Sequence, residues 1–471
     1  MEWIRHQLEC AKFLREQQNY FYFLRPFQVI AGYPASLRTA RAKLGIAFRL
    51  AFYLLYLSSM VHKVIYTLYQ PEDIYYMVFM AGTMGVLTGY LILLGFGSGH
   101  YECLRSLRDF FNDRSFARDH PLAAAIRQRS YRWSNCFILA PQAGLSFIFL
   151  QSFYIGLYAK REMMLMICGE PIGTTFSHAL YSAGLYCPAL GFFMACAIVN
   201  ACLVGLLGEM ELLAVCVGEL DETVAKRLAD QGGEKTRKCF WNVYHAELRR
   251  CAKRHCDIFS NLTQFQQFSS LVFLLHHVLS LALVGGGIYV TLRTDAPLEI
   301  INFTEFPVPI LLLYFTFCLL VEKVQDMNIF IGERLYATKW ILQLRYTREF
   351  HHEYRSAVRT ITILLGRSQQ RIRFTCGSIN EVSMAKFADF INLTYTIKAL
   401  CDKMNLASAF TCASPYLEAR MGENSWRPTT MTGIPIAGWE KRFHCCRTGP
   451  DPAWTEPLQD IAFDRFGGAA E

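Results

Sequence analysis

Charged residues are scarce in this chain of 471 residues. Asp, Glu, Lys and Arg make up only 18% of it, against 53% hydrophobic residues, and aromatic residues alone make up 14%. The mean hydropathy of +0.19 is high for a soluble protein. This composition is typical of a protein that crosses a membrane several times. The first 20 residues lack a continuous apolar core, because charges are scattered from Glu2 to Arg15, so we expect no cleavable signal peptide.

Motifs that carry enzyme chemistry are also missing. The sequence shows no zinc-ligand spacing, no phosphate-binding loop and no Ser-His-Asp arrangement, so we expect no catalytic site, no metal and no cofactor. The net charge of +8 does not indicate nucleic-acid binding, because the basic residues lie in the segments between apolar runs. Ten-residue segments of alternating hydrophobicity, which would indicate a membrane barrel, are absent as well.

Long apolar runs dominate the chain instead. Six of them are near the roughly 20 residues needed to cross the hydrocarbon core of a bilayer. They cover 44–67, 74–97, 136–157, 181–207, 268–291 and 307–325. A seventh candidate, 385–403, carries Lys386, Asp389, Lys398 and Asp402, so its polar side must face protein or water rather than lipid. Because only helices satisfy the backbone here, we predict an all-α polytopic membrane protein with seven transmembrane helices surrounded by membrane lipids.

The distribution of Lys and Arg predicts the orientation. The segments on one side of the predicted helices hold 33 of these residues, and those on the other side hold 3. Since basic loops stay in the cytoplasm, the N-terminus is predicted to be cytoplasmic and the end of the seventh helix to lie outside. This is the inverse of a G-protein-coupled receptor, and the Asp-Arg-Tyr and Asn-Pro-x-x-Tyr motifs of such receptors are missing.

The same patterns divide the chain into five regions. Residues 1–42 form a cytoplasmic, amphipathic N-terminal region, and residues 43–325 hold the first six helices. Residues 326–382 are patterned as helices, which form either a hairpin lying on the membrane or a cytosolic helical anchor region where subunits meet. Residues 383–403 form the seventh helix. Residues 404–471 show no periodicity, so we expect a disordered tail or a mis-predicted gene end that reads into an intron.

Cysteines and one asparagine add expectations about the outer surface. Most of the 17 cysteines lie inside apolar runs, as Cys196 and Cys202 do, which favours hydrophobic packing over a disulfide framework. Cys168 and Cys187 are the two best placed for the outer face, where a disulfide between them is one alternative. The Asn-Phe-Thr sequon at Asn302 falls in the outer loop before the sixth helix, so we predict glycosylation there.

Polar residues also occur inside the helices or at their inner ends. His276 and His277 are expected to be satisfied by contacts between helices. Glu209, Glu211 and Glu322 lie at inner helix ends and are expected to pair with cytoplasmic Arg or Lys.

Residues 318–340 and 363–400 resemble the C-terminal signature of insect odorant receptors, and the likeness extends over about residues 15–403. The marks are Tyr336 with Trp340, then Gln370-Arg371-Ile372, Gly377, Phe387 opening the last helix, and Tyr395 with Leu400 closing it. The related gustatory receptors typically close on Thr-Tyr-(five residues)-Gln-Phe. Here Cys401-Asp402 stands where Gln-Phe would, which favours an odorant receptor over a gustatory one.

The resemblance implies a ligand-gated, non-selective cation channel in the plasma membrane of olfactory sensory neurons. The chain would be a tuning subunit that forms a hetero-tetramer with the shared odorant co-receptor. A gustatory-type channel that assembles alone is the main alternative. A transporter is a weaker one, since the chain lacks an internal repeat of matched broken helices.

The resemblance places a small volatile ligand in the outer half of the bundle, between helices 2, 3, 4 and 6. The residues there are aromatic, Met-rich and sparsely hydroxylated, which suits recognition by shape and dispersion. For each of them ordinary helix packing is the alternative role. The candidates are Met80, Met84, Ser146, Phe149, Phe153, Tyr154, Tyr181, Leu185, Phe192, Leu313, Tyr314 and Phe317.

The resemblance also makes the seventh helix the lining of a central pore. Ile391, Tyr395, Lys398 and Asp402 share one helical face because they are spaced by four, three and four residues, and Thr394 lies beside them. The family's narrowest point lies near Lys398, where a small apolar residue is usual. A lysine there would oppose cation flow, unless it points to a subunit interface or extends to the outer surface.

Overall fold

The computed structural model describes ten segments of the chain and the single residue 399. The segments are 40–68, 74–96, 101–158, 166–167, 170–171, 175–230, 237–291, 307–338, 346–377 and 379–396. Contacts divide the chain into two compact units, one ending at Ala407 and one beginning at Ser408, and every described residue belongs to the first.

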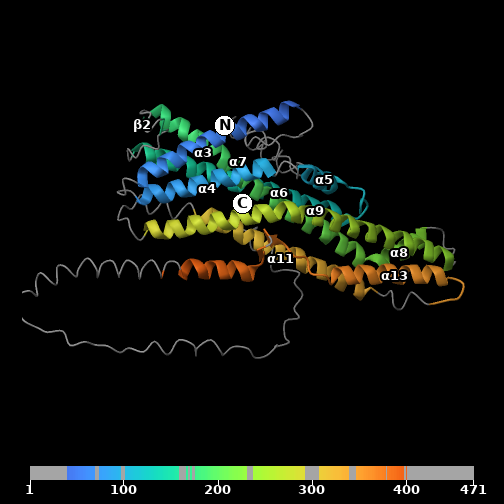
Figure 1. Cartoon of the computed structure of the whole chain (residues 1–471). Helices are drawn as coiled ribbons and strands as arrows, with labels where there is room; N and C mark the ends of the chain where they lie inside the picture. Colours follow the sequence, from blue (N-terminus) through green and yellow to red (C-terminus); the bar gives the residue numbers. More distant parts are fainter. Residues whose placement is uncertain are drawn as a thin grey trace, which may run out of the picture. The chain divides into compact units, whose positions relative to one another are not determined.

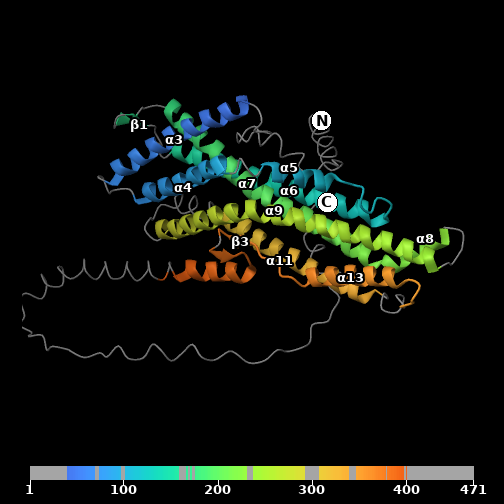
Figure 2. The same cartoon turned by 45° about the vertical axis from the view of Figure 1, so that its right-hand side comes forward.

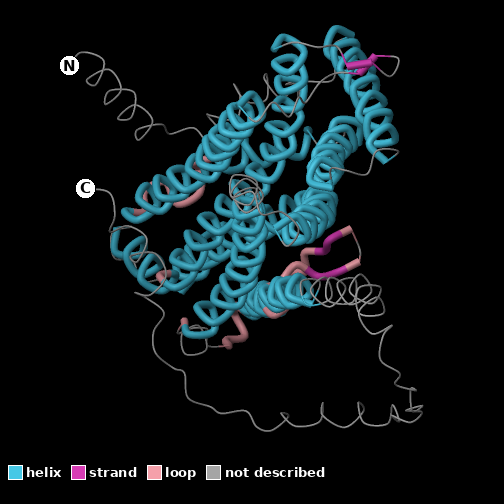
Figure 3. Tube along the Cα trace, turned by 90° about the vertical axis from the view of Figure 1, so that its left-hand side faces the viewer, coloured by secondary structure: helices cyan, strands magenta, loops and turns pink. Residues whose placement is uncertain are grey.

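Helices make up nearly all of the described chain (Figure 1). They are α3 (Ala40–Leu68), α4 (Ile74–Phe96), α5 (Tyr101–Asn112), α6 (Pro121–Tyr158), α7 (Thr175–Gly218), α8 (Leu220–Asp230), α9 (Arg237–Thr291), α11 (Pro307–Ala337) and α13 (His351–Ser368). A further helix covers residues 384–396 and is called the last helix below. Two small antiparallel hairpins, drawn in magenta in Figure 3, complete the set: β1 (Met166–Ile167) with β2 (Glu170–Pro171), and β3 (Thr375–Cys376) with β4 (Asn380–Glu381).

Five of the described helices are long and apolar enough to cross a membrane. The qualifying stretches are Lys43–His62, Pro121–Gln151, Gly184–Gly218, Arg237–Ile288 and Pro307–Ala337, and a shorter apolar stretch lies at Ala81–Gly95 in α4. These coincide with the first six apolar runs of the sequence, and the prediction of an all-α polytopic membrane protein is confirmed.

Helix α7 forms the centre of the bundle. It contacts α6, α11, α9 and α4, and 94% of its apolar stretch is buried. Small residues such as Ala197, Ala201 and Cys202 are fully buried along it, and side chains of this size let neighbouring helices approach closely. Helix α3 is the opposite case, because only 17% of its apolar stretch is buried. Leu44 and Leu55, each more than 70% exposed, lie on the apolar surface of α3 that the other described elements leave uncovered.

Helices α9 and α11 are longer than a bilayer requires. Helix α9 has 55 residues, which at 1.5 Å per residue gives about 80 Å, against about 30 Å of hydrocarbon. It joins the charged segment that begins at Arg237 to the apolar run that ends at Thr291. Helix α13 packs against α9 and α11, as Figure 2 also shows. Ile361 on α13 is fully buried, so α13 packs an apolar face against these two helices.

A glycine sets the turn that leads from β3 to β4. Gly377 has φ +54°, a left-handed conformation that disfavours other residues. A Cβ atom added there would lie 2.5 Å from Cδ2 of Leu274 on α9. The Gly377 N–H donates to both the carbonyl (3.2 Å) and the hydroxyl (3.1 Å) of Ser270. The hairpin is therefore fastened to α9 just before the last helix begins.

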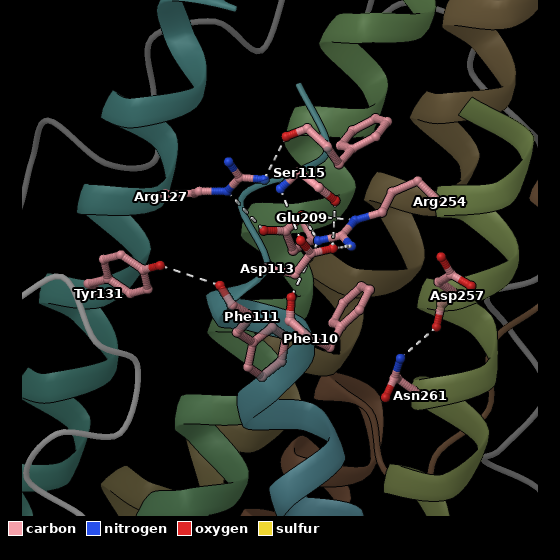
Figure 4. A network of polar contacts seen from close by, with 11 residues as sticks. Phe110, Phe111, Asp113, Ser115, Arg127, Tyr131, Glu209, Arg254, Asp257 and Asn261 are labelled. Carbon is pink, nitrogen blue, oxygen red and sulfur yellow. Dashed lines mark hydrogen bonds and ion pairs between the residues drawn. The ribbon is translucent and has the colours of Figure 1, made fainter. Parts of the chain in front are cut away.

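A buried ionic cluster ties α6, α7 and α9 together (Figure 4). Glu209 on α7 lies between Arg127, with Nε 3.3 Å from Oε1, and Arg254, with Nη2 2.6 Å from Oε2. Arg254 also reaches Asp113, with Nη1 3.3 Å from Oδ2, and Arg127 donates to the Phe116 carbonyl at 2.9 Å. Two guanidinium groups thus face two carboxylates, which compensates charges that burial alone would disfavour.

Asp113, in the loop between α5 and α6, is stabilised in its charged form. Burial alone would raise the pKa of its carboxyl group. Hydrogen bonds from the Ser115 N–H (2.9 Å) and hydroxyl (3.0 Å), together with the charges of Arg254 and Arg127, outweigh that effect and hold the pKa below its ordinary value.

The predicted pairing of the inner glutamates is confirmed for two of the three. Glu209 binds the two arginines described above, and Glu211 forms an exposed ion pair with Arg129 on α6. Glu322 on α11 was expected to pair with Arg or Lys. In the structure its Oε1 instead accepts a hydrogen bond from the Met384 N–H at 2.9 Å, because the last helix begins directly beside it.

Candidate functional site

An apolar crevice lies where α6, α7 and α11 meet. The crevice is partly open, and the empty space among its lining atoms, counted together with that open part, is about 290 Å³. Every residue of its lining is apolar. These residues are Pro141, Leu145 and Ile148 of α6, Phe193 of α7, and Pro309, Ile310 and Leu313 of α11.

Local sequence explains how three helices form this lining. Pro141, Leu145 and Ile148 are spaced by four and three residues, so they share one face of α6. Pro309 lies in the first turn of α11. The N–H groups of a first turn have no partner within the helix, so the N–H that proline lacks costs no helical hydrogen bond. Ile310 and Leu313 follow at a spacing of three and turn the same side of α11 toward α7.

A polar pair joins α6 and α7 close to the crevice. The hydroxyl groups of Ser146 and Tyr186 lie 2.7 Å apart, and the Ser146 hydroxyl also donates to the Gln142 carbonyl at 2.7 Å. The rings of Phe149 and Tyr186 pack at a centroid distance of 5.0 Å. Ser146 and Phe149 come one residue after Leu145 and Ile148, so they lie about 100° further around α6 than the crevice lining.

Two buried amides lie in the same part of the bundle. Gln142 is only 2% exposed, and its side-chain nitrogen and oxygen have no hydrogen-bond partner within the described part of the chain. Asn200 on α7 donates to the Thr316 hydroxyl on α11 at 3.2 Å. The surroundings of the crevice are therefore apolar with a few hydroxyl and amide groups, which suits a small and largely apolar molecule.

The predicted ligand-site residues occupy several different places. Leu313 lines the crevice. Ser146 and Phe149 lie beside the crevice, and both contact Tyr186 of α7. Leu185 and Phe192 are buried in α7, and Met84 is half-buried in α4. The side chains of Met80, Phe153, Tyr154 and Tyr181 lie outside the described residues.

Tyr314 and Phe317 belong to an aromatic cluster between α9, α11 and the last helix. Tyr314 shares a hydrogen bond with Nδ1 of His277 at 2.9 Å, and its ring packs on Phe390 at 5.3 Å. Phe317 packs on His276 at 5.1 Å. The expectation that the histidines are satisfied by contacts between helices is confirmed for His277. The ring of His276 packs on α11, but its Nδ1 pairs with the Ser280 hydroxyl of its own helix at 3.2 Å, and its Nε2 has no hydrogen-bond partner among the described residues.

The last helix holds those predicted pore residues that the structure describes. Thr394 is buried and donates to the Ile391 carbonyl at 2.7 Å, whereas Tyr395 is 67% exposed. Lys398 and Asp402 lie outside the described residues. The exposure of Tyr395 is compatible with a surface that faces water or another subunit.

Two expectations about the outer surface fall on undescribed residues. Asn302 and Cys168 both lie outside the described part of the chain. Glycosylation of Asn302 and a disulfide between Cys168 and Cys187 therefore stay predictions.

Several residues of the crevice were not expected from the sequence. Pro141, Leu145, Ile148 and Phe193 carry no chemical signature that separates them from other apolar residues. The shared face of the first three was visible in their spacing, but the spacing does not reveal which face of α6 meets α7 and α11.

A family model described as "7tm Odorant receptor" matches residues 78–395, about two thirds of the chain. The chain belongs to this odorant receptor family. Among curated proteins, no match was found.

Solved structures of the family share the fold at low sequence identity. The structure of the insect olfactory receptor OR5 from Machilis hrabei in complex with eugenol is 11% identical, with a TM-score of 0.64, over 82% of this chain and 98% of that one. The structure of the same receptor described without eugenol is 12% identical, with a TM-score of 0.62, over 80% and 97%. Membership of the family also confirms that the chain is a receptor of the channel kind and not an enzyme.

Proposed function

We propose that this odorant receptor chain binds a small volatile molecule in the crevice between α6, α7 and α11, and that binding opens a non-selective cation channel. The crevice itself supports the proposal, because it is small, apolar and formed by α7 together with two helices that α7 contacts. Its small size and its lack of charged and polar lining residues favour a compact, uncharged ligand held by dispersion. Eugenol, present in the OR5 structure, is a suitable first probe.

The channel is proposed to be a hetero-tetramer with the odorant co-receptor, in the plasma membrane of olfactory sensory neurons. The last helix of each subunit would line the pore, with Ile391, Thr394, Tyr395, Lys398 and Asp402 as candidate lining residues. The polar character of this segment supports the assignment, since a helix that carries charges is unfavourable in lipid but stable beside water. Residues 326–382 are proposed as the cytosolic region where subunits meet.

The test is heterologous expression followed by recording of odorant-evoked current. The chain is expressed alone and with the co-receptor, and a panel of volatile compounds that includes eugenol is applied. Cation current that requires both subunits is expected. Current from the chain alone would favour the gustatory-type channel, and uptake of a compound without channel currents would favour a transporter.

A matched pair of variants on α6 tests the ligand site. Leu145 lines the crevice and is 6% exposed, whereas Leu150 on the same helix is 68% exposed. Leu145→Trp fills the crevice and is expected to raise the half-maximal odorant concentration at least about tenfold, because the ligand loses the space for its dispersion contacts. Leu150→Trp is expected to leave it unchanged. Equal dose–response curves at matched surface expression would exclude the crevice as the ligand site.

A further inference from the structure

The segment between α13 and the last helix is bonded to α11 by side chains. Gln325 accepts a hydrogen bond from the Ile372 N–H through its Oε1. The amide of Asn328 donates to the carbonyls of Ser368 (2.9 Å) and Gln370 (3.1 Å). Glu322 accepts from the Met384 N–H at 2.9 Å. Because Glu322, Gln325 and Asn328 are spaced by three residues, one side of α11 holds this segment over two turns.

Helix α9 holds the same segment from another side. Gln266 donates to the Arg373 carbonyl at 2.9 Å, and Ser270 accepts from the Gly377 N–H. The backbone that leads into the last helix is therefore fixed by two long helices, and one of them, α11, also lines the crevice.

Glu322 meets the last helix at its first turn. The N–H groups of this turn have no partner within the helix and must be satisfied from outside it. Ser383 accepts from the Lys386 N–H through its hydroxyl at 3.3 Å, as an N-cap residue does. Glu322 supplies the acceptor for the Met384 N–H. A carboxylate in this place also interacts favourably with the positive end of the helix dipole.

We propose that Glu322 is a positioning residue that couples the crevice to the last helix. Leu313 lines the crevice nine residues before Glu322, about 14 Å along the same continuous helix. Tyr314, the residue after Leu313, packs its ring against Phe387 and Phe390 of the last helix, at centroid distances of 5.7 Å and 5.3 Å. Helix α11 thus contacts the last helix at two points, and a displacement of α11 by a ligand reaches Met384 through the Glu322 carboxylate. The coupling rests on the proposed function, whereas the positioning contact does not.

Amide hydrogen exchange of the full-length chain in detergent tests the contact without any channel activity. The readout is the exchange rate of the Met384 amide. In Glu322→Ala the rate is expected to rise about tenfold or more, the change that corresponds to losing a hydrogen bond to a charged group. Glu322→Gln retains an acceptor of the same shape and is expected to show a smaller rise. Glu333→Ala, an exposed position on the same helix, is the control and should match the wild type.

Odorant-evoked current per surface receptor tests the coupling. Glu322→Ala is expected to lower the maximal current severalfold while odorant binding persists, Glu322→Gln to recover most of it, and Glu333→Ala to behave as wild type. A merely structural role would reduce the number of surface receptors and leave the current per receptor unchanged, which would overturn the coupling.

The two measurements separate failure of the inference from failure of the proposed function. Equal Met384 exchange in Glu322→Ala and Glu333→Ala overturns the positioning role, whether or not the wild type conducts. Altered exchange, together with a wild type that gives no current with any odorant, supports the positioning role and overturns the channel function on which the coupling rests.

Discussion

The buried cluster around Glu209 allows a sharp prediction of stability. Glu209→Gln keeps the size of the side chain but removes its charge. Arg127 and Arg254, whose side chains are 9% and 4% exposed, would then be opposed, within the described part of the chain, only by Asp113, whose side chain is 43% exposed. Removing one partner of a buried ion pair costs about 3–5 kcal/mol, because the remaining charge is left uncompensated. We expect a loss of unfolding free energy in that range.

Helix α7 supplies the matched control two residues further on. Glu211 pairs with Arg129 on the same neighbouring helix, but these side chains are 33% and 43% exposed. An exposed pair contributes about 0–1 kcal/mol, so Glu211→Gln should hardly change stability. The assay is unfolding of the purified chain by denaturing detergent, followed by tryptophan fluorescence. Equal midpoints for the two variants would refute the reasoning, since each substitution removes one carboxylate that pairs with an arginine of α6.

A double variant tests whether uncompensated charge is the cause. If the loss in Glu209→Gln comes from two buried guanidinium groups facing each other, removing one of them should restore part of it. The combination of Glu209→Gln with Arg254→Met is expected to be more stable than the sum of the single effects, by about 0.5–3 kcal/mol. Strict additivity would show that the single variants act through lost packing instead.

Three further outcomes are expected. Gly377→Ala should lower the unfolding midpoint by an amount equivalent to at least about 1 kcal/mol, because its φ of +54° and the Leu274 side chain both oppose a Cβ atom. Asp113→Asn should lower thermal stability at pH 7, and the difference from wild type should disappear at acidic pH. The folded-state pKa of Asp113 is depressed, so its contribution is present above the ordinary value of 3.8 and is lost as the pH falls through the lower folded value. Lys398→Val should raise the conductance or change the cation selectivity of the channel formed with the co-receptor, and identical current–voltage curves would contradict a pore-facing lysine.

Length and composition predicted a helix well where its residues are apolar from end to end. The apolar run 74–97 became α4, Ile74–Phe96, and the run 181–207 lies within α7, Thr175–Gly218. Helix α9 was harder, because the charged residues from Arg237 and the apolar run after them look like two separate segments. They form one helix because the sequence contains no Pro, and no Gly before Gly285, that would interrupt the backbone hydrogen bonds.

The crevice could be predicted only in outline. The sequence indicates which residues are apolar and which share a helical face, but the face that meets another helix is decided by packing. Leu313 and Tyr314 show the difference. They are neighbours in the sequence and both were candidates for the ligand site, yet Leu313 lines the crevice and Tyr314 contacts His277 and Phe390. A rotation of 100° per residue separates the two surroundings.

The glutamates at the inner helix ends lead to the same conclusion and extend it. Glu209 and Glu211 are equivalent in the sequence, but two residues correspond to about 200° of rotation, so one is buried among arginines and the other is exposed. Glu322 differs again, because its partner is a backbone N–H that chain topology brings back from 62 residues later. A carboxylate next to a helix start acts directly on the backbone of that helix, whereas Glu209 and Glu211 join helices through arginine side chains. Glu322, whose partner is the hardest of the three to predict from the sequence, is therefore the glutamate best placed to connect α11 with the last helix.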